Sequence, residues 1–133
     1  MKLLRSVLLM CALCALAGTA SAEDAVWSVA GREVFRLRAT VGEWTPAKRV
    51  DELDGRLTEI LSKEDAPLRT SDIVLKVHKG AAAIYVRGML LVTVAKQDAA
   101  ACKTTREKLG RTWLHNLRNT LPLVSPRVNP GGA

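Results

Sequence analysis

The densest group of reactive side chains in this 133-residue sequence lies between Val92 and Leu121, in VTVAKQDAAACKTTREKLGRTWLHNLRNTL. It combines a cysteine, a histidine, a tryptophan and many basic residues, the types found in redox, metal and nucleic-acid sites. Cys102 comes just before a predicted helix, a position that can make a thiol reactive, and His115 follows thirteen residues later. Structural zinc usually needs four clustered ligands, so we predict no metal site. A reactive Cys102 stays open beside an inert one.

Common catalytic motifs are absent from the sequence. The chain contains no GxSxG elbow, no HExxH pair and no phosphate-cradling glycine loop. The neighbouring carboxylates of Asp51 and Glu52 fall on the outer face of a predicted helix, where they would solubilise the protein. We therefore predict no catalytic residue and no cofactor. The alternative, a small periplasmic enzyme of unknown reaction, would need distant polar side chains to converge, for example those of Tyr85, His78, Asp98 and Cys102.

The first 22 residues have the pattern of a cleaved secretory signal peptide. Lys2 and Arg5 give a positive start, residues 6–18 are apolar, and Ala20-Ser21-Ala22 supplies small residues for cleavage. We predict export to the periplasm with cleavage after Ala22, and retention as an anchor is the alternative. The mature chain has 133 − 22 = 111 residues, and its 18 basic and 13 acidic residues give a formal charge of +5.

The mature chain is predicted to form one domain. It keeps a single cysteine, which cannot close an intramolecular disulfide, so the fold must depend on its apolar core. We place this domain at residues 23–121, a normal size for one domain. Residues 122–133 contain three prolines and end in Gly-Gly-Ala, which predicts a flexible tail. We expect no transmembrane span after cleavage, because no later stretch is apolar for long enough.

Alternating apolar and polar residues predict a series of β-strands. Residues 26–41 contain two such runs around Ala30-Gly31-Arg32, a predicted tight turn. Residues 73–78 form another run, which ends at Lys79-Gly80. Residues 84–94 contain two more on either side of Gly88, and this pattern predicts an antiparallel hairpin.

A first helix is predicted between the strands. Thr45 offers an N-cap and Pro46 suits the first helical position, where the missing N–H costs nothing. Apolar residues then recur at helical spacing from Val50 to Leu61, and we expect the helix to end near Glu64. Trp44 precedes this helix, either as a packing partner of the Lys48 stem or as a surface anchor.

A second helix accounts for most of the reactive-looking stretch. Thr104 and Glu107 fit a capping box, and Pro122 is expected to stop the helix. Gly110 costs about 1 kcal/mol relative to alanine, so we expect a close packing contact there. One face carries apolar residues at four-residue steps: Leu109, Trp113, Leu117 and Leu121. The predicted fold is α+β, with a four- or five-stranded mainly antiparallel sheet carrying two helices on one face.

The basic residues form a second candidate for function. Such charge can bind anionic lipid head groups, polyanionic envelope polymers or an acidic partner, and the alternative is a solvated face that keeps the domain in solution. Export argues against a nucleic-acid partner. The residues proposed for contact with an anion or partner lie along one predicted strand and on the second helix: Arg32, Arg36, Arg38, Lys103, Arg106, Lys108, Arg111 and Arg118.

Residues 29–121 resemble the extracytoplasmic segment that precedes the membrane helices in some bacterial mechanosensitive channel proteins of the small-conductance type. The similarity is carried by VAGREVFRLRA, by TPAKRVDELDGRLTEIL, by DIVLKV and by the stretch from Val92 to Trp113. That family continues into membrane helices and a pore domain, whereas this sequence stops. The resemblance therefore implies a non-enzymatic periplasmic interaction or sensor module without ion conduction, whose oligomeric state is open.

Overall fold

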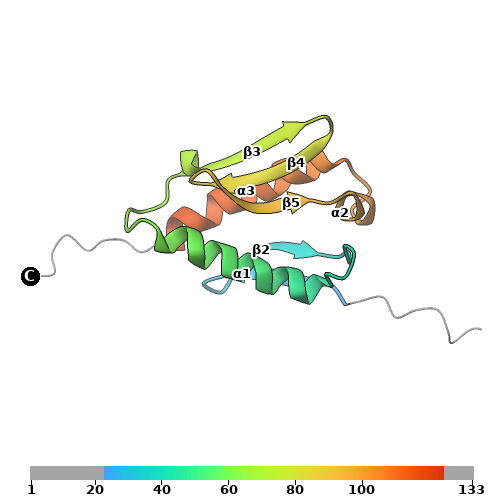
Figure 1. Ribbon diagram of the computed structural model, residues 1–133, viewed down its shortest axis with the longest axis horizontal. Coiled ribbons are helices and arrows are strands. Elements are labelled where there is room, and N and C mark those ends of the chain that lie inside the picture. Colours follow the sequence, from blue (N-terminus) through green and yellow to red (C-terminus); the bar gives the residue numbers. More distant parts are fainter. Residues whose placement is uncertain (1–22, 125–133) are drawn as a thin grey trace, which may run out of the picture.

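The computed structural model describes residues 23–124 (Figure 1). The predicted signal peptide, residues 1–22, and residues 125–133 of the predicted tail lie outside the described residues. The elements follow one another in the order β1 (Ala25–Val29), β2 (Arg32–Leu37), α1 (Pro46–Ser62), the short 3₁₀ helix η1 (Thr70–Asp72), β3 (Ile73–His78), β4 (Ala81–Val86), β5 (Met89–Val94), α2 (Lys96–Ala101) and α3 (Arg106–Val124).

The α+β class and the antiparallel strand pairing are confirmed. Within residues 23–124 the strands divide into a two-stranded sheet, β1-β2, and a three-stranded sheet, β3-β4-β5, where one continuous sheet was expected. Sequential strands pair because each two-residue turn is built for a hairpin. Both central residues have positive φ, as in Ala30 (50°) and Gly31 (77°), and the same holds for Lys79-Gly80 and Arg87-Gly88.

Each sheet contains one β-bulge whose extra residue faces a helix. Trp27 pairs with Phe35 and Ser28 with Glu33, so Val34 is the extra residue in β2. The Val34 carbonyl accepts a hydrogen bond of 2.9 Å from Asn116 of α3.

The second bulge is in β5. Ile84 pairs with Val92 and Tyr85 with Leu90, which leaves Leu91 as the extra residue. Its carbonyl accepts a hydrogen bond of 3.1 Å from Arg56 of α1. Side chains from helices thus bond to the outer edges of β2 and β5, so these edges do not pair into one sheet.

Helix α3 packs on the three-stranded sheet through its apolar face, as predicted. An added Cβ on Gly110 would lie 3.0 Å from Leu75 and 3.4 Å from Ala82, so the missing side chain allows the close approach. Trp113 is 3% exposed and stacks on Phe35 of β2, with ring centroids 4.4 Å apart. Leu109, Leu117 and Leu121 are buried with it. This part of the reactive-looking stretch is core.

The ends of α3 differ from the expected ones. The Thr105 hydroxyl, rather than that of Thr104, accepts from the third helical N–H, that of Lys108, at 3.2 Å. The predicted stop at Pro122 is wrong, because α3 continues to Val124 with Pro122 inside its last turn. Proline removes its own N–H, and Leu121, which is 1% exposed, keeps this turn attached to the core.

Helix α1 begins as predicted but occupies a different place from α3. Thr45 caps it by accepting from the Lys48 N–H at 3.3 Å. Both long helices pack on one face of β1-β2, because the paired residues Trp27 and Phe35 contact α1 and α3 respectively. Figure 1 also shows α1 beside β5, while α3 runs behind the strands. A hydrogen bond of 2.8 Å from the Trp27 indole to Asp54 attaches α1 to β1.

Candidate functional site

A groove with a volume of about 310 Å³ opens between α1, β5 and the segment that joins β2 to α1. The groove forms because α1 lies beside the edge of β5 and bonds to it through the long side chain of Arg56. Apolar side chains from three elements line it, among them Leu37, Leu53 and Leu91. Thr93 of β5 lies at its exposed rim.

Trp44 stands at the mouth of this groove. The chain from Val41 to Trp44 forms a tight turn closed by two backbone hydrogen bonds of 2.9 Å between these two residues, with Gly42 at a φ of 59°. The turn holds the indole 50% exposed, although tryptophan is normally largely buried. Trp44 and Lys48 line one shallow hollow on α1, so both interpretations of Trp44 from the sequence stay open.

A buried ion pair anchors one end of the groove. The guanidinium of Arg49 donates to both carboxylate oxygens of Asp98, at 2.6 and 2.7 Å, and also to the Ala39 carbonyl at 2.9 Å. Asp98 is 2% exposed and accepts a third bond from the Ala95 N–H at 2.9 Å. The pair therefore ties α1 to α2 and to the segment after β2. A bidentate arrangement of this kind fixes direction as well as distance.

A second arginine forms the opposite wall. Arg56 donates to Glu52, one turn earlier on α1, at 3.0 Å, and to the Leu91 carbonyl. The charged groups around the groove are thus bonded to one another or to backbone carbonyls. Trp44 is half exposed, while the lining residues Leu37, Leu53 and Leu91 are at most 3% exposed. This chemistry suits the binding of an apolar or aromatic group. A shallower hollow of about 450 Å³ continues over the outer surface of α1, between Trp44 and Glu59.

The basic residues predicted as a contact surface do not line this groove. Arg32, Arg36 and Arg38 are exposed on and just after β2, and Arg38 lies 4.0 Å from Asp24. Arg118 is not free, because it donates to the Ile73 carbonyl at 2.8 and 3.0 Å and so holds α3 to the start of β3. The remaining predicted cations lie at the start of α3 or just before it: Lys103, Arg106, Lys108 and Arg111.

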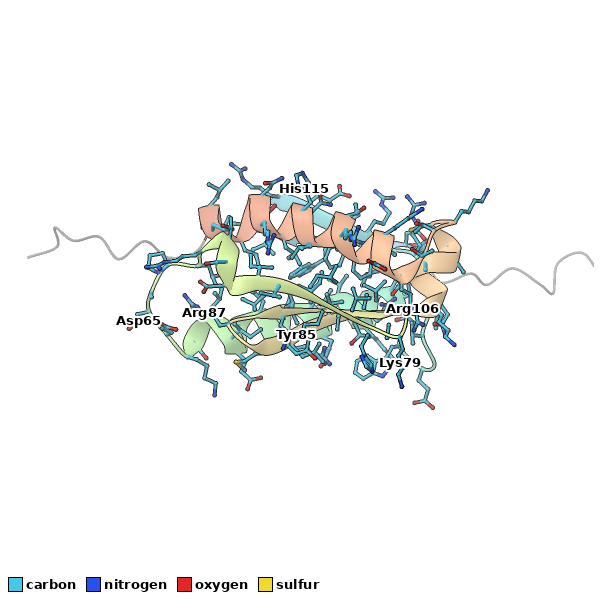
Figure 2. The ribbon with its side chains drawn as sticks, turned by 90° about the horizontal axis from the view of Figure 1, so that it is seen from above. Asp65, Lys79, Tyr85, Arg87, Arg106 and His115 are labelled. Carbon is cyan, nitrogen blue, oxygen red and sulfur yellow. The ribbon has the colours of Figure 1, made fainter. Side chains whose placement is uncertain are left out.

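The four residues of the enzyme alternative lie on separate elements. Tyr85 of β4 lies under the ammonium of Lys76, 4.4 Å from the ring centroid, and His78 is exposed at the end of β3. Asp98 is bonded to Arg49, and Cys102 is exposed after α2. None of the four lines either of the two hollows described here. Figure 2 shows His115 on the outer side of α3.

Residues 25–122 match the family described as "Domain of unknown function (DUF8459)". This chain belongs to the DUF8459 family. The matched span runs from the first residue of β1 into the last turn of α3, so it includes every residue that lines the groove. Comparison with curated proteins and with solved structures gave no match.

Sequence reasoning missed two parts of the site in this DUF8459 protein. It did not predict α2 or the pairing of Arg49 with Asp98. A local signal was present, because Asp98 is the third residue of α2, where a carboxylate can accept the N–H of the residue that precedes the helix. Across residues 23–124, no helix has both the length and the apolar character of a membrane crossing.

Proposed function

We propose that this chain is a non-enzymatic interaction or sensor module that works in the periplasm after export. The proposal draws on the signal-like start of the sequence and on the resemblance to the extracytoplasmic segment of mechanosensitive channel proteins, here without a pore. It places the contact in the groove between α1 and β5, and the partner is an envelope protein that presents an apolar or aromatic side chain.

The half-exposed indole of Trp44 beside an apolar groove carries this proposal. Tryptophan is enriched among the residues that dominate binding energy in protein interfaces, especially beside a pocket that excludes water. The arginines at the rim are already held by Asp98, Glu52 and backbone carbonyls. A partner therefore meets a fixed rim, so that little side-chain entropy is lost on binding.

A crosslinking experiment in cells that produce the full chain tests this assignment. A photo-crosslinking amino acid at Thr93, on the rim, is compared with the same amino acid at Val26, which is 37% exposed on β1 and does not line the groove. We expect a discrete adduct from the Thr93 position alone. Adding Trp44→Ala should reduce its yield about tenfold, because losing an aromatic anchor commonly costs more than 1 kcal/mol.

Two results would contradict the proposal. Equal adducts from the two positions would show that the groove is not the contact. Turnover of a small-molecule panel by the purified mature chain, abolished by Cys102→Ala, would favour the enzyme alternative. A Trp44→Ala variant that keeps the wild-type thermal unfolding midpoint serves as the control for folding.

A further inference from the structure

The charge of this chain is divided unevenly along its length. Residues 23–72 contain eight lysines and arginines against eleven aspartates and glutamates, a balance of −3. Residues 73–124 contain nine against two, a balance of +7. An asymmetry of this size between two halves of a domain is typical of proteins that meet a charged surface.

The two acidic residues of the second half do not neutralise its lysines. Asp98 is buried against Arg49 of α1, and Glu107 pairs with Arg111 at 2.6 Å. Among the cations, Arg118 bonds to the Ile73 carbonyl and Arg87 to the carbonyls of Glu64 and Ala66. Lys76 lies over the Tyr85 ring. The remaining five cations have no carboxylate within 4.0 Å in the described part of the chain: Lys79, Lys96, Lys103, Arg106 and Lys108.

These five residues, called the basic end below, come together from four separate segments. His78 pairs with Ala81 and Ala82 with Val94, so the β3-β4 turn that carries Lys79 lies at the same end of the sheet as the start of α2. The first turns of α3 reach this end too, because a Cβ on Gly80 would lie 3.6 Å from the guanidinium of Arg106. Figure 2 shows Lys79 and Arg106 at one end of the molecule, and Asp65 at the other.

We propose that the basic end docks on an anionic phospholipid surface. Four of its five cations are lysines, and these four are exposed. Lysine acts as a hydrated point charge on a flexible stem, which suits the diffuse charge of many head groups. A site for one bound phosphate would instead favour arginines that form bidentate hydrogen bonds. Each lysine or arginine near an anionic bilayer adds a similar increment of attraction, so five together hold a domain weakly and reversibly.

The surroundings of the basic end favour lipid over an acidic protein. A specific protein interface usually needs large buried anchors at its centre. The exposed apolar residues of the segments that carry these cations are mostly small, namely Ala81, Ala100 and Ala101, with Val77 at the margin. Neither of the two hollows described above extends to Lys79 or Lys103. This contact goes beyond the proposed function, since it needs no occupant in the groove.

Vesicle sedimentation of the purified mature chain tests the proposal. We expect binding to vesicles that contain phosphatidylglycerol at about 50 mM salt, its loss at about 500 mM, and no binding to phosphatidylcholine alone. The triple variant Lys79→Glu, Lys103→Glu and Lys108→Glu should weaken binding at least about tenfold. The matched control, Arg32→Glu, Arg36→Glu and Arg38→Glu, changes the net charge by the same six units on and just after β2, and it should weaken binding less than about threefold.

The outcomes separate this proposal from its rivals. No binding to anionic vesicles at low salt, or equal losses in the two triple variants, would overturn it. Binding to polyglutamate but not to vesicles would assign the basic end to an acidic protein instead. If the first triple variant does not fold, single Lys79→Gln and Lys103→Gln variants should each lower the salt concentration at half-binding. Trp44→Ala should retain vesicle binding within about twofold, which keeps this test independent of the groove.

Discussion

The two long helices meet the strands in different ways. Helix α3 packs through apolar surface, with Gly110 against the sheet, Trp113 stacked on Phe35, and Leu117 fully buried. Helix α1 has a buried apolar face as well, but it is joined to its neighbours by long polar side chains. Arg49 reaches Asp98 and Arg56 reaches the β5 edge. The first interface is closed, and the second leaves the groove of about 310 Å³.

This contrast shows how the fold can leave a groove open at its surface without weakening its core. An apolar interface is most stable when it contains no gaps, because each gap loses dispersion contacts and hydrophobic burial. A bidentate ion pair instead fixes two elements at a set distance, whether or not the space beside it is filled. The closely packed interface of α3 therefore contributes most to stability, and the interface of α1 leaves the groove open.

The largest expected effect compares one leucine from each side. Leu117→Ala should lower the free energy of unfolding by about 4 kcal/mol, because it leaves a cavity in the closed interface. Leu53→Ala should cost less, about 2.5 kcal/mol, because Leu53 borders the groove and the space can relax or admit water. Urea unfolding of both variants measures the difference. Equal losses would contradict the distinction between a closed and an open interface.

The next effect concerns the ion pair. Asp98→Ala should lower the free energy of unfolding by about 3 kcal/mol, because it leaves the largely buried guanidinium of Arg49 without its carboxylate. The double variant Arg49→Met with Asp98→Leu should recover most of this loss, since neither charge then needs a partner. Urea unfolding of the single and double variants forms the test. A double variant as unstable as Asp98→Ala would show that the pair does not act as a unit.

The smallest effect compares the two helix side chains that bond to bulge carbonyls. Asn116→Ala should cost about 1.5 kcal/mol, because the Val34 carbonyl then lacks a partner in the closed interface. Arg56→Ala should cost less than about 1 kcal/mol, because water in the groove can bond to the Leu91 carbonyl instead. Thermal and urea unfolding measure both, and exposed Leu123→Ala is the control. A larger loss of unfolding free energy for Arg56→Ala than for Asn116→Ala would contradict this prediction.

Local patterns were enough to predict most elements of the fold. The X-Gly turns predicted the hairpins, Thr45-Pro46 predicted the start of α1, and the four-residue spacing from Leu109 predicted the buried face of α3. The bulges at Val34 and Leu91 were not predicted. Each is a shift in the pairing of two strands, and the residue pattern within one strand does not show that pairing. The division into two sheets follows from those bulges and the helix side chains bonded to them.

The candidate sites were less accessible to sequence reasoning. Arg111 and Arg118 resembled free cations in the sequence, yet the fold pairs one with Glu107 and bonds the other to a backbone carbonyl. Lys79 and Lys96 were overlooked because they are isolated along the chain, and only the meeting of the β3-β4 turn with α2 and α3 brings them to the basic end.

The sequence by itself determined the α+β class, the hairpins and the apolar face of α3, because turn chemistry and side-chain periodicity act over a few residues. The tertiary structure alone decided that Arg49 meets Asp98, that Trp44 stands beside a groove and that four segments share one basic end. These features depend on side chains about fifty residues apart or on the ends of several elements, and no local pattern encodes the distance between them.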